Sequence, residues 1–138
     1  MLTTYNIGVA GYCAQEFDWD DARIQLKRHL SQYTNNNVAI VSGLSDMGVP
    51  GIAYRIAKDL DIPTIGIAAG KARGAKNLWP CDEVYFVGQN WGDESMFFLG
   101  KIHQLVAYEG GQQTKREISL AKELGIKVIE LSAGSKCE

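Results

Sequence analysis

Cysteines are scarce in this sequence, and long apolar runs are absent from it. The three cysteines, Cys13, Cys81 and Cys137, form neither a C-x-x-C pair nor an even disulfide framework, which favours a reducing, cytoplasmic setting. No apolar run approaches the ~20 residues that a membrane-spanning helix needs. The first residues also lack a basic segment followed by an apolar one, so a signal peptide is not expected.

An excess of charge of either sign is also missing. The 138 residues include 14 basic and 16 acidic ones, for a net charge of −2, which gives no general attraction for nucleic acid or an anionic membrane. The two histidines, His29 and His103, have no partner at metal-ligand spacing, so we expect no metal site and no cofactor. Length and an apolar content of 46% predict one domain over residues 1–132, followed by a flexible polar tail at 133–138.

Short apolar runs alternate with segments of helical periodicity. Strands are predicted at 5–11, 38–43, 62–70, 83–88, 103–111 and 126–131, and helices at 17–33, 49–60, 94–102 and 114–124. We expect Asp18 to cap the first helix, Pro50 to stand at the first position of the second, and Gly125 to follow the last one. This alternation predicts an α/β fold: a three-layer, Rossmann-like, doubly wound, mainly parallel sheet of about six strands, with helices on both faces.

Glycines and serines cluster at the ends of three predicted strands. Ligands of such folds bind beyond the carboxyl ends of the strands, where glycine lets backbone N–H groups approach an anion. Neither the G-x-G-x-x-G nor the G-x-x-x-x-G-K-[ST] motif occurs at these turns. The residues predicted to bind a phosphate-bearing ligand at this edge are Gly11, Ser42, Gly43, Ser45, Gly48, Gly110, Gly111, Gln112 and Thr114.

The spacing of Thr114 and Glu117 supports two interpretations. A Thr followed three residues later by a Glu matches the capping box, in which each side chain binds a backbone N–H at the helix start. The preceding pair, Gly110 and Gly111, is left unexplained by a cap and favours an anion seat. In that case Glu117 would accept hydrogen bonds from a ligand or act as an acid or base, and the two roles are compatible.

Two segments resemble a known family. Residues 40–70, "IVSGLSDMGVPGIAYRIAKDLDIPTIGIAAG", contain a turn similar to that of DNA-processing protein A. Residues 110–129, "GGQQTKREISLAKELGIKVI", resemble the G-G-x-G-T-x-x-E motif of the "lonely guy" phosphoribohydrolases. Both groups belong to the SLOG superfamily of Rossmann-like nucleotide-binding proteins. The resemblance implies a nucleotide or phosphoribosyl ligand at Gly110, Gly111 and Thr114, with Glu117 as the catalytic residue for cleavage of an N-glycosidic bond.

The sequence departs from that motif at several positions. Gln113 stands at the third glycine of the motif, and Gly92 and Asp93 stand where the family has an Arg-Lys pair. Arg73 either supplies charge to a phosphate or is a solvated loop cation. Asp93 is a further candidate site residue, whereas Glu94 is interpreted as an acidic residue that favours a helix N-terminus.

Three functions remain open on these residues. The first is binding of a nucleotide or phosphoribosyl ligand, with hydrolysis of its N-glycosidic bond as the candidate reaction. The second is a non-catalytic nucleotide sensor or binding module. The third is single-strand DNA binding through the basic loop that contains Lys71, Arg73 and Lys76, which the slightly acidic balance of the chain disfavours.

Aromatic residues predict contacts beyond the sheet edge. We expect a homodimer or a higher homo-oligomer, with Trp19, Phe97 and Phe98 supplying apolar contact area. Trp79 and Trp91 lie in predicted loops and would stack on a base or pack at a subunit interface.

Overall fold

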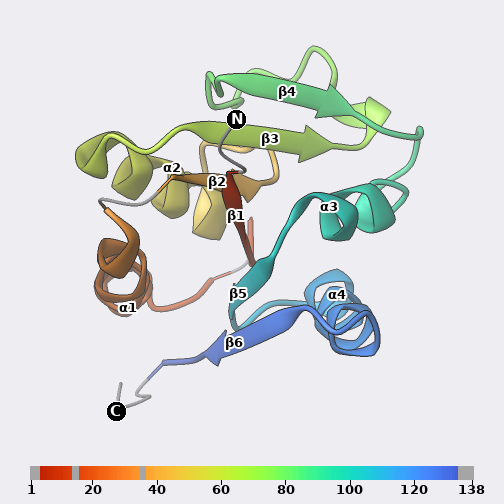
Figure 1. The fold of residues 1–138 in the computed structure, drawn as a ribbon. Coiled ribbons are helices and arrows are strands. Elements are labelled where there is room, and N and C mark those ends of the chain that lie inside the picture. The colour runs from red at the N-terminus through yellow and green to blue at the C-terminus, as the bar shows by residue number, and fades with distance from the viewer. Residues whose placement is uncertain (1–3, 14–15, 35–36, 134–138) are drawn as a thin grey trace.

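Six parallel strands form one sheet in the computed structural model, which describes residues 4–13, 16–34 and 37–133. The strands are β1 (Tyr5–Gly11), β2 (Val38–Ser42), β3 (Thr64–Ala68), β4 (Glu83–Phe86), β5 (Gln104–Tyr108) and β6 (Lys127–Leu131). Their order across the sheet is β4-β3-β2-β1-β5-β6 (Figure 1). Residues 134–138 of the predicted tail lie outside the described residues.

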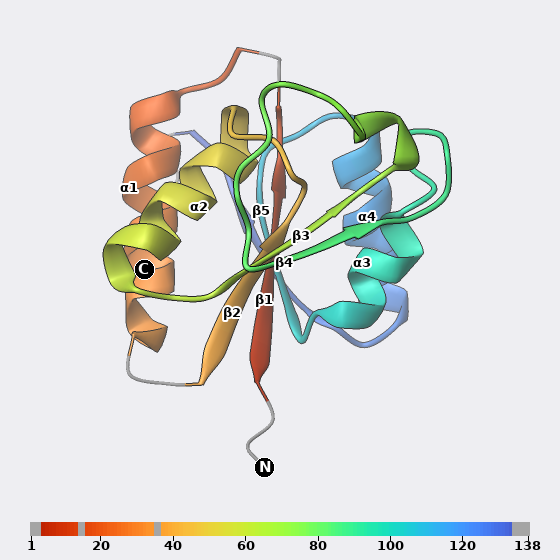
Figure 2. The same cartoon turned by 90° about the horizontal axis from the view of Figure 1, so that it is seen from above.

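Helices cover both faces of the sheet, as predicted. The main helices are α1 (Trp19–Leu30), α2 (Gly48–Leu60), α3 (Ser95–Lys101) and α4 (Gln112–Glu123). Figure 2 shows α1 and α2 on one face and α3 and α4 on the other. Two short 3₁₀ helices, η1 (Ser31–Tyr33) and η2 (Gly70–Ala72), follow α1 and β3. The α/β class, the three layers and the parallel sheet are therefore confirmed.

The helix ends test the capping predictions. Asp18 caps α1 by accepting a hydrogen bond of 3.0 Å from the Asp21 amide, as expected. Gly125 follows α4 with a φ of 75°, the left-handed conformation that ends helices. Pro50 was predicted at the first position of α2, which is wrong because the helix begins two residues earlier, at Gly48. Pro50 still lies among the first helical positions, where an N–H has no intrahelical partner.

The direction of chain growth reverses next to β1. After β1 the chain adds β2, β3 and β4 on one side, and then returns to add β5 and β6 on the other. The carboxyl ends of β1 and β5 are in register, with Gly11 opposite Tyr108. The connections that leave these two strands go to opposite faces of the sheet, towards α1 and α4 (Figure 2). This is the switch point at which open α/β sheets bind their ligands.

Two apolar layers pack against the central strands. One lies between the sheet and helices α1 and α2, and the other between the sheet and helices α3 and α4. At the switch point, Gly11 allows the sheet and the α2 helix of the first layer to pack closely. A Cβ atom on Gly11 would lie 2.6 Å from Cγ2 of Val49, in α2, and 2.7 Å from the carbonyl oxygen of Tyr108, in β5. Only a residue without a side chain fits between these two elements.

We expect Gly11→Ala to destabilise the fold by about 1–3 kcal/mol, the usual cost of overpacking, because the Tyr108 carbonyl belongs to the sheet and cannot move aside. The matched control is Gly100→Ala, in α3, where an added Cβ has no atom within 4 Å and alanine favours the helix by roughly 0.5–1 kcal/mol. Urea unfolding midpoints measure both effects. Equal midpoints for the two variants would contradict the packing argument.

Candidate ligand-binding site

A cavity of about 590 Å³ opens at the carboxyl edge of the sheet, within the roughly 300–1,000 Å³ typical of small-molecule sites. Its walls come from the ends of β1, β2 and β3, the loop before α3, and the first turns of α2 and α4. The glycine turns that the sequence placed at one edge therefore lie together. The predicted residues that line the cavity are Gly11, Ser42, Gly43, Ser45, Gly111, Gln112, Thr114 and Glu117.

Two predicted glycines, Gly48 and Gly110, support the wall without lining it. Gly48 has a φ of 62°, and a Cβ there would lie 2.3 Å from the carbonyl oxygen of Tyr12. Gly110 has a φ of 121°, and its Cβ would lie 2.5 Å from Cβ of Thr114. Both positions need a backbone conformation that favours glycine, so they shape the turns that carry the lining residues.

The first turn of α4 presents unpaired backbone N–H groups. Its N-cap is Gly111, whose lack of a side chain leaves the helix start without a side-chain cap. The amides of Gln112, Gln113 and Thr114 have no acceptor among the described residues. Helix N-termini of this kind attract anions through these donors and the helix dipole. Since Gly111 and Gln112 line the cavity, an anionic group is favoured at this end.

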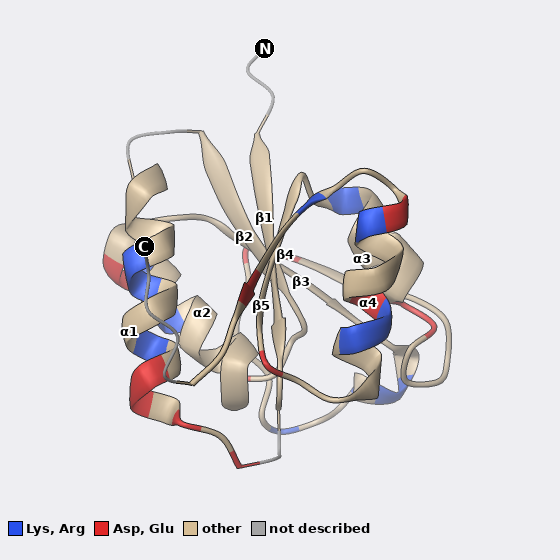
Figure 3. Ribbon diagram, turned by 90° about the horizontal axis from the view of Figure 1, so that it is seen from below, with Lys and Arg blue, Asp and Glu red and all other residues tan. Residues whose placement is uncertain are grey.

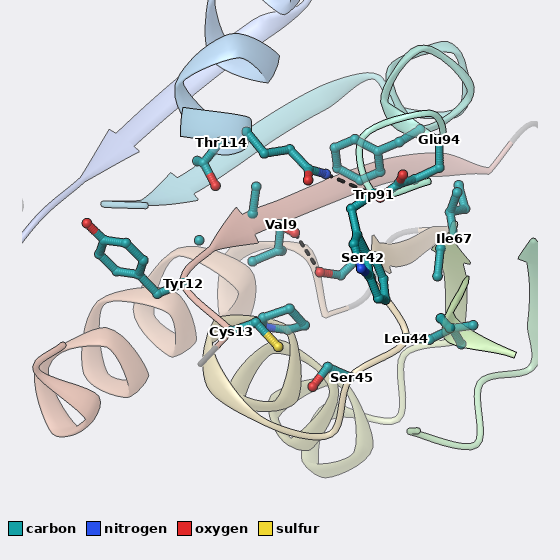
Figure 4. A pocket seen from close by; sticks show the side chains of 18 of the residues that line it. Val9, Tyr12, Cys13, Ser42, Leu44, Ser45, Ile67, Trp91, Glu94 and Thr114 are labelled. Carbon is teal, nitrogen blue, oxygen red and sulfur yellow. Dashed lines mark hydrogen bonds between the residues drawn. The ribbon is translucent and has the colours of Figure 1, made fainter. Parts of the chain in front are cut away.

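The start of α2 offers less to an anion than the sequence suggested. The Val49 amide already donates to the Tyr12 carbonyl at 2.8 Å, and Pro50 has no N–H to donate. The Ser42 hydroxyl donates to the Val9 carbonyl at 2.6 Å (Figure 4), so only its lone pairs remain for a ligand. Ser45 is different: its oxygen accepts from the Met47 amide at 3.0 Å, which leaves its hydroxyl proton for a ligand.

The capping-box interpretation of Thr114 and Glu117 is wrong. Helix α4 begins at Gln112, so Thr114 is its third residue rather than its cap. The Thr114 hydroxyl makes no cap hydrogen bond and points into the cavity that Thr114 lines (Figure 4). Glu117 does not reach back to the helix start. It accepts hydrogen bonds from the Ser95 hydroxyl at 2.7 Å and from the Gln113 side-chain amide at 3.3 Å.

A second buried carboxylate, Glu94, stands beside Glu117. The exposed fractions are 8% for Glu94 and 6% for Glu117, and both residues line the cavity. Glu94 accepts from the Gly92 amide at 2.9 Å and from the Gln113 side-chain amide at 3.2 Å. One amide nitrogen of Gln113 thus joins the two carboxylates. No sequence pattern singles out Glu94 as a functional residue, because an acidic residue at a helix start is common.

Burial raises the pKa of Glu117, since a low-dielectric environment disfavours the ionised form. The hydrogen bonds from Ser95 and Gln113 lower this pKa, the negative charge of Glu94 raises it, and the positive charge of Arg116 lowers it, in decreasing order of effect. The net result is a cavity carboxyl that holds its proton more tightly than an exposed glutamate does.

The structure places two candidate residues outside the cavity lining. Asp93 is exposed and accepts hydrogen bonds from the amides of Gln89 and Asn90, at 3.1 and 2.9 Å. These bonds lower the pKa of Asp93 and hold the loop before α3. The guanidinium carbon of Arg73 lies 4.4 Å from the ring centre of Phe86. Neither Asp93 nor Arg73 lines the cavity.

The remaining lining is mostly apolar and carries no lysine or arginine within the described ranges. Leu44, Ile67 and Phe98 form its walls, and Trp91, 62% exposed, stands at the rim (Figure 4). Trp79 does not reach the cavity, because it stacks on Tyr54 at a centroid distance of 5.9 Å. The cavity therefore combines flat apolar walls with a donor-rich end at α4 and two carboxylates.

Two other kinds of feature are absent from the described residues. No group of three or more His, Cys, Asp and Glu side chains is placed to hold a metal ion. No helix in the same part of the chain is long and apolar enough to cross a membrane.

Comparison with solved structures shows the same fold in other proteins. The Moco carrier protein of Chlamydomonas reinhardtii matches with a TM-score of 0.78 and 21% identity, over 96% of this chain and 79% of that one. The molybdenum cofactor binding protein of Rippkaea orientalis matches with a TM-score of 0.77 and 23% identity, over 96% and 78%. The X-ray structure of the structural-genomics target TM1055 matches with a TM-score of 0.71 and 18% identity, over 91% and 72%.

Comparison of the sequence itself was less informative. No protein-family model matches the chain, and no curated protein matches it. At 18–23% identity the structural likeness establishes the Rossmann-like fold. Membership of the SLOG superfamily stays a prediction.

We expect the stability of the fold to depend on pH through Glu117. A raised pKa means that the folded chain binds this proton more tightly than the unfolded chain does. The free energy of unfolding should therefore fall as pH rises from the unfolded-state pKa through the higher folded-state pKa, by about 1.4 kcal/mol for each pH unit between the two values. Glu117→Gln removes this loss.

Urea unfolding of the wild type and Glu117→Gln at about pH 4 and pH 7 tests this sign, because the lower value lies near the ordinary glutamate pKa. The variant should gain stability relative to the wild type at the higher pH. Glu123→Gln, an exposed position on the same helix, is the matched control. A wild-type-to-variant difference that does not change with pH would contradict the burial argument.

Proposed function

We propose that this chain binds a small phosphorylated heterocyclic ligand of the nucleotide class at the carboxyl edge of its sheet. The observation that carries the proposal is the row of unpaired amides at the start of α4, which faces the same cavity as the apolar walls. A phosphate and a flat ring are the two ligand parts that these features recognise.

The phosphate end is supported by neutral donors. The amides of Gln112, Gln113 and Thr114, together with the hydroxyl groups of Thr114 and Ser45, provide donors without a positive side chain. Backbone amides and a helix dipole bind an anion without a cation. The lack of lysine and arginine among the described lining residues favours a ligand with few phosphates, since each further charge would need its own compensation.

The ring end is supported by the shape and chemistry of the opposite wall. Figure 4 shows Trp91, Ile67 and Leu44 across the cavity from Tyr12 and Thr114. Because the Trp91 side chain is largely exposed, it has apolar area to bury against a ligand ring. The ligand thus spans from the α4 amides to the Trp91 wall.

The structural comparisons support a binding role. Two of the similar structures are described as a carrier and as a binding protein of the molybdenum cofactor. We infer by analogy that this chain also holds a small molecule, which favours the sensor or binding module among the functions weighed from the sequence. The shared fold supports the binding of a small molecule, and the cavity of this chain indicates the chemistry of that molecule.

Hydrolysis of an N-glycosidic bond is the second candidate function. Glu117 favours it, because a cavity carboxyl with a raised pKa is suited to proton transfer. The amide of Gln113 and the hydroxyl of Ser95 already bind this carboxylate, and the family's Arg-Lys pair is replaced by Gly92 and Asp93. Binding without turnover is therefore our primary proposal.

The distribution of charge disfavours single-strand DNA as the partner. Lysines and arginines are spread over helices on both sides of the sheet, including α1 on one side and α3 and α4 on the other (Figure 3). A homodimer in the cytoplasm stays a proposal. Of the side chains predicted to form its interface, Phe98 is buried in the core and lines the cavity, whereas Trp19 is 43% exposed.

A nucleoside 5′-monophosphate is expected to raise the melting temperature and to bind at least tenfold more tightly than its nucleoside. Thr114→Val should weaken binding of the monophosphate by roughly tenfold, since a hydrogen bond to a charged group contributes about 1.5–3 kcal/mol. Thr34→Val, at the opposite edge of the sheet from the cavity, should change nothing. Isothermal titration calorimetry measures these constants. Equal binding of phosphorylated and unphosphorylated ligand would refute the anion seat.

Turnover is tested separately with the same monophosphates. Prolonged incubation with the wild type is expected to release no free base detectable by chromatography, because no lysine or arginine among the described lining residues holds the ribosyl phosphate in place while the base leaves. If base does appear and Glu117→Gln abolishes its release, while the variant still binds the monophosphate, hydrolysis replaces binding as the function.

A further inference from the structure

Hydrogen-bond acceptors dominate one wall of the cavity. The side-chain nitrogen of Gln113 donates to both Glu94 and Glu117, so its amide oxygen is turned away from them as a further acceptor. The hydrogen bonds from Ser95 and Gln113 both go to the Oε2 atom of Glu117, and Oε1 takes part in neither of them. Within the cavity, Oε1 is left for a ligand.

A ligand that fits this wall must bring donors. A ligand that covers this carboxylate takes water away from it, so a ligand group without a proton to donate leaves the oxygen unpaired. Sugar hydroxyl groups and ring N–H groups both supply donors. The flat apolar surroundings distinguish them: Glu94 stands next to Trp91 in Figure 4, with Ile67 on the same side. Such walls suit the face of an aromatic ring better than a sugar.

We propose, building on the proposed function, that this wall selects rings that carry an N–H beside an exocyclic amino group. This is the donor edge of the 2-amino-4-oxopyrimidine ring, which guanine and pterins share. Glu117 Oε1 and the Glu94 carboxylate are the acceptors for the two donors, and the α4 amides take the phosphate of the same ligand.

Hypoxanthine and adenine do not present both donors to this wall. Hypoxanthine keeps the ring N–H but lacks the amino group, so it brings one donor fewer to the two carboxylates. Adenine presents a ring nitrogen with a lone pair, which repels a carboxylate oxygen. Sites built around such hydrogen bonds discriminate strongly, because the analogue leaves a buried polar group unsatisfied.

Ligand binding also changes the proton of Glu117. Burial raises the pKa of this carboxyl in the empty cavity, and two N–H donors favour its ionised form. Binding is therefore expected to tighten as pH rises through the folded-state pKa of Glu117. The titratable and charged groups that act on this carboxyl are Glu94, on the loop before α3, and Arg116, on α4.

Calorimetry at neutral pH with two matched pairs of probes tests the proposal. The first pair is guanosine and inosine 5′-monophosphate. The second is 6-hydroxymethylpterin phosphate and the corresponding lumazine phosphate, in which oxygen replaces the amino group. We expect the amino-bearing member of at least one pair to bind at least tenfold more tightly than its partner. The pair that binds more tightly identifies the ligand as a nucleotide or a pterin.

Variants then assign the preference to the carboxylates. Glu117→Gln and Glu94→Gln should bring the ratio within the preferred pair close to one, while the partner that lacks the amino group still binds, which shows that the variants are folded. Glu123→Gln, exposed on α4, should keep the ratio. Adenosine 5′-monophosphate should bind at least tenfold more weakly than the preferred ligand.

The outcomes separate this inference from the proposed function. Equal binding within both pairs, or a preference that survives both carboxylate substitutions, overturns the inference and leaves nucleotide-class binding in place. Absence of binding for all five probes contradicts both.

Discussion

The close packing of three elements around Gly11 is the constraint on which the site depends. At this residue β1 ends beside β5, and the first turn of α2 lies against both, with no room for a Cβ atom. Because the chain leaves β1 and β5 towards opposite faces, the edge between them stays open. The cavity is the direct consequence of this geometry, since its floor consists of the strand ends that no connection covers.

The cavity is electrically asymmetric, although the whole chain is close to neutral. Unpaired amides of α4 give one part a positive partial charge, and Glu94 and Glu117 give another part acceptor character. The distance along α4 from Gly111 to Glu117 is about 9 Å at 1.5 Å per residue. Both features are carried by, or bonded to, the same helix, so a ligand with an anionic end and a donor edge has one preferred orientation.

Local patterns were sufficient to predict the elements and their class. Apolar runs identified all six strands, and Asp18 and Gly125 identified two helix ends. Strand order could not be read in the same way, because it depends on packing between distant segments. The site was predictable to the extent that it follows from glycines after parallel strands. The sequence could not show which of two adjacent acidic residues faces the cavity. Asp93 turns outward to hold loop amides, while Glu94 turns into the cavity.

The capping box does not form for a similar reason, because a contact with a distant segment competes with it. That contact also determines how the carboxylates of the site are held. A Thr and a Glu at this spacing cap a helix when nothing better competes, but Ser95 on α3 offers Glu117 a buried hydroxyl that local sequence does not reveal. Gln113 then places its amide between Glu117 and Glu94, at the position where the motif it resembles has glycine. An amide there reduces the repulsion of two neighbouring carboxylates and fixes their directions. Carboxylates held in this way are organised acceptors, and such preorganisation lowers the cost of recognising a ligand.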